Sequence, residues 1–399
     1  MLHFDVMATL AIATLILLLG QHIKRQVPVL HRYNLPSPVI GGLLAAIALL
    51  LCKSYTTVDI TFDNGARTPL MIAFFTTLGF AASLKLLKIG GRFVFIFLAI
   101  SIFAAILQNV VGASIATLLG LPPLLGVLCG SVTLTGGPAT GLAFAPQFEQ
   151  AGIVGAEAIA VAAAMCGIIM GGVMGGPIGT LLINRLVRQN QPLTSNHHNQ
   201  SIINTALELL NHHSETALLK SIGMILLAMW MGSWVSAGFQ ALGITLPAYI
   251  GAMLVAATLR NLDDKTGHFK LSETTIENLG AVALSYFLVL SLMGLDLSKL
   301  ATVALPLLIL IAAQVLLIAL LSVTLIFKFM GKDYEAAVTA TGFYGFMMGT
   351  TANAMANMDA FVQRYSPAPR AYLVVPIVGA FFIDFANTIL VQFCLAWLK

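Results

Sequence analysis

Long apolar segments follow one another along almost the whole sequence, and only short polar stretches separate them. Of the 399 residues, 58% are hydrophobic and 9% are charged. A soluble domain has no core large enough to bury so much apolar surface, whereas a bilayer solvates it. The sequence therefore predicts an all-α polytopic membrane protein, because helices satisfy their own backbone hydrogen bonds in lipid.

The apolar segments form two sets of five. Crossings are predicted near 5–22, 38–52, 69–86, 93–119 and 153–184, and again near 219–242, 246–260, 279–297, 301–328 and 370–397. Each half also holds one interrupted stretch, at 122–149 and at 334–365. We expect three regions, namely an N-terminal repeat at 1–186, a polar linker at 187–217 and a C-terminal repeat at 218–399.

Short matches at a nearly constant offset predict that the two halves arose by duplication. Ile40-Gly-Gly-Leu-Leu-Ala-Ala46 matches Ile250-Gly-Ala-Met-Leu-Val-Ala256, at an offset of 210. Leu78-Gly79 before Ser83 matches Met293-Gly294 before Ser298 at an offset of 215, and Gly136 matches Gly349 at 213. An odd number of crossings in each half would insert the second repeat upside down relative to the first.

The basic residues predict the orientation in the membrane. Sixteen of the 20 Lys and Arg residues fall in loops on one predicted side, and four fall on the other. The positive-inside rule then places both termini outside and the linker at 187–217 in the cytoplasm. The stretch at 122–149 would enter the membrane from outside, and the stretch at 334–365 from the cytoplasm.

A run of small and hydroxyl residues, Ser131-Val-Thr-Leu-Thr-Gly-Gly-Pro-Ala-Thr-Gly141, interrupts the first of these stretches. The apolar part before it has about twelve residues, too few to cross a hydrocarbon core of roughly 30 Å. Two half-helices with a turn at Gly136-Gly137-Pro138 would form a re-entrant hairpin, the second arm starting near Ala139. The first arm would offer carbonyls to a cation, and the second would offer amides to a carboxylate. The alternative is a glycine-rich packing kink without a ligand.

The second interrupted stretch carries a polar stripe. Thr350, Asn353 and Asn357 stand at i, i+3 and i+7, so they share one helical face if the outgoing arm starts near Gly349. Thr351 adds a hydroxyl at the turn. Such a stripe either holds helices together or contacts a ligand. Because it starts at a helix break, we favour contact with a ligand.

Asp384 lies near the middle of the last predicted crossing, with Asn387 and Thr388 on the same face. An ionisable group at membrane depth is costly, and it indicates a cation ligand, a proton carrier or a partner for a substrate ammonium. The alternative is a hydrogen-bonded Asp that only holds helices together.

Three amides, Gln108, Asn109 and Gln314, lie in the fourth crossing of each half and are interpreted as helix-packing groups. The four cysteines stand too far apart for a metal or disulfide pattern. A lone mid-membrane Asp without His, Ser or a second carboxylate gives an enzyme little chemistry. We expect no catalytic residue.

Four runs carry a resemblance to the bacterial glutamate:sodium symporter family, and the likeness covers nearly the whole chain. The runs are Ser131-Val-Thr-Leu-Thr-Gly-Gly137, Met330-Gly-Lys-Asp-Tyr-Glu-Ala-Ala-Val338, Ala354-Met-Ala-Asn-Met358 and Leu373-Val-Val-Pro-Ile-Val-Gly-Ala-Phe-Phe-Ile-Asp384. The resemblance implies a dimeric carrier in the bacterial inner membrane, with inverted repeats, two re-entrant hairpins and an elevator-like movement. Pro138 and Phe343 stand where members of the family often carry His.

We therefore expect sodium-coupled uptake of glutamate or a similar anionic amino acid. The alternative is a proton-coupled or exchange carrier of another organic anion, such as a dicarboxylate or 2-hydroxycarboxylate. Expected substrate-binding residues are Thr135, Gly136, Gly137, Thr140, Gly349, Thr350, Thr351, Asn353 and Asn357. Expected cation-binding residues are Thr133, Asp384 and Asn387, with a sodium site at Thr133, Asn357 and Asp384. Expected partners are the substrate, sodium, the bilayer and a second copy of the chain; no cofactor and no nucleic acid are expected.

Overall fold

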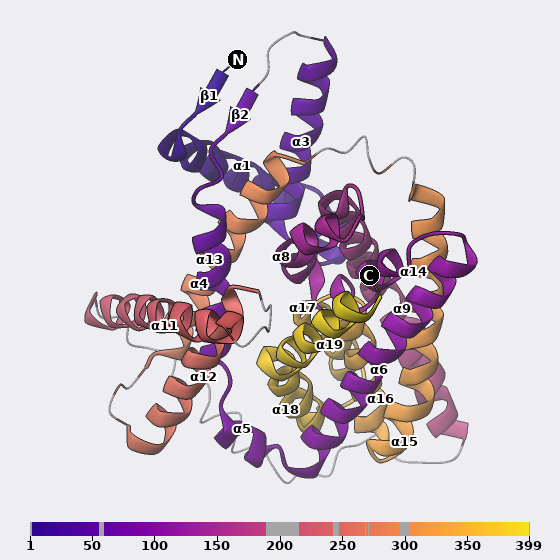
Figure 1. The fold of residues 1–399 in the computed structure, drawn as a ribbon. Coiled ribbons are helices and arrows are strands. Elements are labelled where there is room, and N and C mark those ends of the chain that lie inside the picture. The colour runs from indigo at the N-terminus through magenta and orange to yellow at the C-terminus, as the bar shows by residue number, and fades with distance from the viewer. Residues whose placement is uncertain are drawn as a thin grey trace. The chain divides into compact units, whose positions relative to one another are not determined.

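The computed structural model describes residues 2–55, 60–188, 215–241, 247–267, 269, 271–295, 300 and 303–398, and these are mostly helical (Figure 1). Most of the predicted linker at 187–217 lies outside the described residues. The chain divides into two compact units. Unit 1 consists of Met1–His31, Pro36–Lys85 and Glu208–Ser298, and unit 2 of Arg32–Leu35, Leu86–Leu207 and Lys299–Lys399. Each unit therefore takes residues from both halves of the sequence.

The described residues of unit 1 form six helices of at least 14 residues. These are α1 (Val6–Gln26), α3 (Ser37–Tyr55), α4 (Arg67–Phe80), α11 (Glu215–Ala241), α12 (Tyr249–Thr266) and α13 (Glu273–Met293). Small residues let the helices approach closely: a Cβ atom on Gly232 of α11 would lie 2.2 Å from the Cα of Ala252 on α12. The short α2 (Pro28–Arg32) follows α1.

A small parallel sheet departs from the predicted all-α fold. The strands β1 (Leu2–Phe4) and β2 (Ile60–Phe62) pair in unit 1, and the rings of Phe4 and Phe62 stack at 5.5 Å. β-branched and aromatic side chains favour such an extended pair. Three residues are too few for an alternating pattern to reveal the strand in the sequence.

The crossing predicted at 69–86 ends early, and the structure corrects it. Helix α4 stops at Phe80, and a separate helix, α5 (Leu84–Ile89), follows. Between them the side chain of Asn261 replaces helical hydrogen bonds, since its Oδ1 accepts from the Leu84 N–H at 2.9 Å and its Nδ2 donates to the Ala82 carbonyl at 2.7 Å. The Ser83 hydroxyl donates to Asp264 at 2.5 Å.

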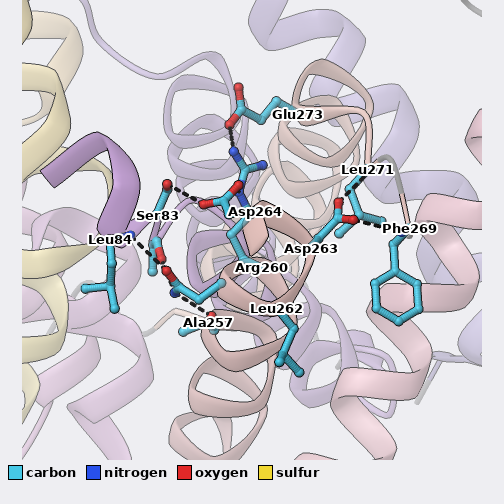
Figure 2. A network of polar contacts seen from close by, with 12 residues as sticks. Ser83, Leu84, Ala257, Arg260, Leu262, Asp263, Asp264, Phe269, Leu271 and Glu273 are labelled. Atoms are coloured by element: carbon cyan, nitrogen blue, oxygen red, sulfur yellow. Dashed lines mark hydrogen bonds and ion pairs between the residues drawn. The ribbon is translucent and has the colours of Figure 1, made fainter. Parts of the chain in front are cut away.

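We call Ser83, Arg260, Asn261 and Asp264 the polar clamp. Ion pairs on α12 and α13 complete it, and Figure 2 shows Ser83, Arg260, Asp264 and Glu273 together. Arg260 lies 3.1 Å from Asp264 and also pairs with Glu273. The clamp holds the chain directly before Lys85, the last residue of this segment of unit 1. Polar side chains from the second half thus terminate a helix of the first half.

Unit 2 holds the two interrupted stretches and the helices around them. Its elements are α6 (Gly91–Leu118), α7 (Pro123–Val127), η1 (Leu128–Val132), α8 (Gly137–Gln150), α9 (Ala156–Arg188), α14 (Ala304–Leu321), η3 (Ser322–Ile326), α15 (Phe327–Phe329), α16 (Tyr334–Met347), α17 (Thr351–Val362), α18 (Pro369–Ile377), η4 (Val378–Phe382) and α19 (Ile383–Trp397). The elements labelled η are π-helical segments, which often lie at functional sites.

Element boundaries recur at the offset found in the sequence. Helix α6 begins at Gly91 and α14 at Ala304, and 304 − 91 = 213. Helix α9 begins at Ala156 and α18 at Pro369, again 369 − 156 = 213. These two pairs of helix starts agree with the sequence offset. The duplication, and the inverted orientation of the second half in the membrane, remain predictions.

Six of the described helices are long and apolar enough to cross a membrane. They are Val6–Gln26, Gly91–Leu118, Ala156–Leu186, Leu218–Ala241, Glu273–Met293 and Ala304–Phe329. The other four predicted crossings, at 38–52, 69–86, 246–260 and 370–397, fall on shorter or interrupted helices. The chain is thus a multi-pass membrane protein, while the number of ten crossings remains a prediction.

Candidate functional site

The first interrupted stretch consists of two short helical arms joined by a buried turn. We call residues 123–150, from α7 to α8, hairpin 1. Its first arm leaves helical geometry at Gly130 (φ −101°, ψ −128°), and the Thr133 hydroxyl donates to the Leu128 carbonyl at 2.7 Å. Gly137 has φ +68°, a conformation that glycine adopts without the steric cost of a Cβ. Pro138 then lies in the first turn of α8, where its missing N–H costs nothing.

The second interrupted stretch has the same arrangement with different chemistry. We call residues 334–362, from α16 to α17, hairpin 2. Thr350 is the N-cap of α17, and its hydroxyl accepts from the Asn353 N–H at 3.4 Å. The outgoing arm therefore starts within two residues of the predicted Gly349. In hairpin 2 a capping side chain stabilises the turn, whereas in hairpin 1 the turn depends on the left-handed conformation of Gly137.

Asn353 and Asn357 are both buried and face α9, in line with their predicted common face. The Asn353 Nδ2 donates to the Ile168 carbonyl at 2.7 Å, and the Asn357 Nδ2 donates to the Gly171 carbonyl at 2.9 Å. Asn357 also donates to the Thr341 carbonyl at 3.3 Å. The amide oxygen of Asn353 is buried without a hydrogen-bond partner among the described residues.

The tips of the two hairpins meet. A Cβ atom on Gly137 would lie 3.6 Å from the carbonyl oxygen of Gly349. Helix α9 passes against both tips, because a Cβ atom on its Gly167 would lie 2.6 Å from both Leu134 and the Met348 carbonyl. The structure thus brings together two glycine turns that are far apart in the sequence.

Gln108 of α6 contacts both tips. Its Nε2 donates to the Met347 carbonyl at 3.1 Å, and its Oε1 accepts from the Thr135 hydroxyl at 2.6 Å. The backbone carbonyl of Gln108 accepts a hydrogen bond from the Gln314 Nε2 at 2.7 Å. Gln314 therefore connects α14 to α6, and Gln108 connects α6 to both tips; the packing role of both amides remains a prediction.

Asp384 lies in the first turn of α19, directly after η4. Among the described residues, no group donates a hydrogen bond to its carboxylate; only its backbone carbonyl accepts, from Thr388 at 2.8 Å. One turn further, the Asn387 Nδ2 donates to the Ser131 carbonyl at 2.9 Å. The last helix therefore lies against the first arm of hairpin 1.

Ser131 is the residue that the sequence prediction omitted from the site. Its N–H donates to the Asn109 Oδ1 at 3.1 Å, so Ser131 lies between Asn109 and Asn387. Three buried polar atoms there have no hydrogen-bond partner among the described residues, namely Ser131 Oγ, Asn387 Oδ1 and Asn109 Nδ2. Two features of the sequence could have indicated this cluster: Ser131 opens the polar run, and Asn109 lies within an apolar helix.

The remaining predicted site residues support the tips rather than form one cluster. Thr140 is buried behind Gly136, whose added Cβ would lie 2.6 Å from the Thr140 Cβ. Thr351 faces η4, since a Cβ atom on Gly379 would lie 3.0 Å from its hydroxyl. The described hydrogen bonds do not join Asn357 to Thr133 or Asp384, the three residues of the predicted sodium site.

The oxygens available to a cation are amide, hydroxyl and backbone oxygens with one carboxylate. Within the described part of the chain, no three His, Cys, Asp or Glu side chains gather as a transition-metal site would require. Neutral oxygens on a broken helix suit a hard monovalent ion, and Asp384 stands one turn before Asn387 on α19.

The sequence matches one protein family over most of its length. The family model for the sodium/glutamate symporter matches residues 2–367. The chain is 39% identical over 396 residues to the sodium/glutamate symporter of Escherichia coli, covering 98% of both proteins. It is 36% identical over 393 residues to that of Haemophilus influenzae, covering 98% of this chain and 96% of the relative. The chain therefore belongs to the sodium/glutamate symporter family.

Proposed function

We propose that this protein is a secondary transporter that couples the inward flow of sodium to the uptake of glutamate. The observation that carries the proposal is the meeting of the two hairpin tips at Gly137 and Gly349 inside unit 2. Broken helices that meet at one place expose N–H and carbonyl groups to a ligand, which is how secondary transporters bind substrate and ion. The relatives from Escherichia coli and Haemophilus influenzae are sodium/glutamate symporters, which agrees with this chemistry.

Glutamate would bind between the tips. The tip segments 131–141 and 345–357 contain no Lys or Arg. The carboxylates of glutamate would therefore bind not to basic side chains but to the free N–H groups at the starts of α8 and α17, where the helix dipole favours negative charge. The unpaired Oδ1 of Asn353 is a buried acceptor suited to the substrate ammonium. Gly136, Gly137 and Gly349 would line this pocket at the tips, and Thr135, Thr140, Thr350, Thr351 and Asn357 would hold the tips in place.

Sodium would bind at the end of the first arm of hairpin 1. Asp384 supplies a negative charge, and the unpaired oxygens of Ser131 and Asn387 lie on the elements that pack there. Thr133 adds its hydroxyl and carbonyl at the same arm. A cation bound here would neutralise Asp384 and order the tip, so that substrate binds the sodium-loaded protein more tightly.

Transport would follow from movement of unit 2, which carries both hairpins, relative to unit 1. The chain passes between the units at several positions, among them Lys85–Leu86. Two inverted repeats would give the inward-facing and outward-facing states similar free energies. We further propose that this movement is elevator-like, that the protein forms a homodimer and that both termini lie outside the cell.

Uptake of labelled glutamate by the purified full chain in proteoliposomes tests the proposal. An inward sodium gradient should drive concentrative uptake, and replacement of sodium by choline should abolish it. Undiminished uptake in choline, or uptake driven by a proton gradient alone, would sink the sodium hypothesis. If dicarboxylates or 2-hydroxycarboxylates compete with labelled glutamate more strongly than unlabelled glutamate does, the result would support the alternative, a carrier of another organic anion.

A further inference from the structure

Gln108 is fully buried in α6, and its amide joins the two hairpin tips. One partner, Thr135, directly precedes the glycine turn of hairpin 1. The other, the Met347 carbonyl, is at the end of α16, two residues before Gly349. Thr135 and Met347 are 212 residues apart in the sequence (347 − 135), so this side chain connects the two repeats at their tips.

The chemistry of the partners fixes the orientation of the amide. A carbonyl oxygen only accepts, so the Nε2 of Gln108 must face Met347. The Oε1 then faces Thr135 and accepts its hydroxyl proton. Each end of the amide therefore contacts one tip. Methionine has a similar volume but offers no donor and only a weak acceptor.

Gln314 provides a matched comparison. It is equally buried and is also an amide in an apolar helix, α14. Its Nε2 donates to the backbone carbonyl of Gln108 and to neither tip. Loss of the Gln314 amide therefore removes a contact between α6 and α14 but leaves the link between the tips in place.

We propose that Gln108 is a positioning residue that holds the two tips at the spacing in which glutamate bridges them. This inference rests on the proposed function. Without the link, the substrate itself must order the tips on binding, which lowers its affinity. The movement of unit 2 does not depend on this hydrogen bond, so the maximal rate is retained.

Uptake kinetics of Gln108→Met and Gln314→Met in proteoliposomes test the positioning role. Loss of two buried hydrogen bonds should raise the KM of Gln108→Met for glutamate about tenfold, with a maximal rate within about twofold of wild type. The KM of Gln314→Met should stay within about twofold of wild type. An equal rise in both variants, or a fall in maximal rate at unchanged KM, would overturn the inference.

Hydrogen exchange measured by mass spectrometry gives a second readout that needs no substrate. In Gln108→Met, exchange should accelerate in peptides covering both 128–141 and 343–353, whereas Gln314→Met should match wild type. Thr135→Val, which cuts only one side of the link, should accelerate exchange in 128–141 alone.

Unchanged exchange in Gln108→Met would refute the positioning role, whatever the transport data show. A wild-type protein that takes up no glutamate would refute the proposed function instead, and the exchange comparison would still decide the role of Gln108. If Gln108→Met fails to fold, Thr135→Val decides: accelerated exchange at both tips would contradict the inference.

Discussion

The two hairpins reach the same point by different means. Hairpin 1 turns through backbone freedom, with Gly130 outside helical geometry and Gly137 at φ +68°. Hairpin 2 turns through side chains, since Thr350 caps α17 and Asn353 ties it to α9. Two segments can therefore follow similar chain paths with different chemistry at the turn. We associate hairpin 1 with the cation and hairpin 2 with the substrate ammonium.

The largest expected effect is that of Asp384→Asn. The change keeps the shape of the side chain but removes the charge proposed to bind sodium. Loss of a charged interaction of about 3 kcal/mol corresponds to a fall in uptake of about a hundredfold. Initial rates at varied sodium concentration would measure this, with size-exclusion chromatography as the control for folding. Uptake with wild-type sodium dependence would show that Asp384 only holds helices together.

A paired substitution tests the division of labour between the hairpins. Asn353→Ala should raise the KM for glutamate about tenfold and change the sodium half-saturation by less than about threefold. Asn387→Ala should do the reverse, because its free Oδ1 lies beside Ser131 on hairpin 1. Both constants come from uptake curves in proteoliposomes. If either substitution moves both constants equally, the two hairpins share one site and the contrast fails.

Gly137→Ala tests whether hairpin 1 depends on backbone freedom. The added Cβ meets ordinary contact distance, so the expected cost of about 1–2 kcal/mol comes from the left-handed conformation. Thermal unfolding in detergent and the KM for glutamate should both report it. Gly176→Ala in α9 is the matched control, because no atom lies within 4 Å of its added Cβ and helical alanine is favoured. Equal effects of the two substitutions would argue against a strained tip.

The smallest expected effect concerns the cap of hairpin 2. Thr350→Ala removes the hydroxyl that accepts from Asn353 N–H and should destabilise the start of α17 by about 1 kcal/mol. The KM for glutamate should rise about threefold to fivefold. Thr350→Ser retains the hydroxyl and should stay close to wild type. A Ser variant as impaired as the Ala variant would show that the threonine methyl, and not the cap, matters.

The sequence alone was sufficient to locate the apolar helices and both turns. Glycine, proline and hydroxyl residues inside apolar segments have few physical explanations other than a helix break, so Gly137 and Thr350 were found directly. Hydropathy also placed the six described helices that are long and apolar enough to span a membrane to within about six residues at each end. These features are local, and local composition determines them.

Long-range partners could not be predicted. Nothing near Leu84 in the sequence indicates that Asn261 ends helix α4, because the two residues are 177 positions apart. Ser131 and Asn387 are separated by 256 positions, and the sequence around Asn387 does not indicate which atom of its amide contacts hairpin 1. A buried amide shows in the sequence that a partner is needed, but only the packed structure identifies that partner.

The link at Gln108 also has a consequence for biogenesis. Its amide reaches the Met347 carbonyl 239 residues further along the chain, and its carbonyl reaches Gln314 206 residues further. While the ribosome is still making the second half, Thr135 is already present, but the Met347 carbonyl that accepts from the Gln108 Nε2 does not yet exist. An insertion factor or water must satisfy Gln108 during that interval, so the first half by itself should be a substrate for quality-control proteolysis until α16 arrives.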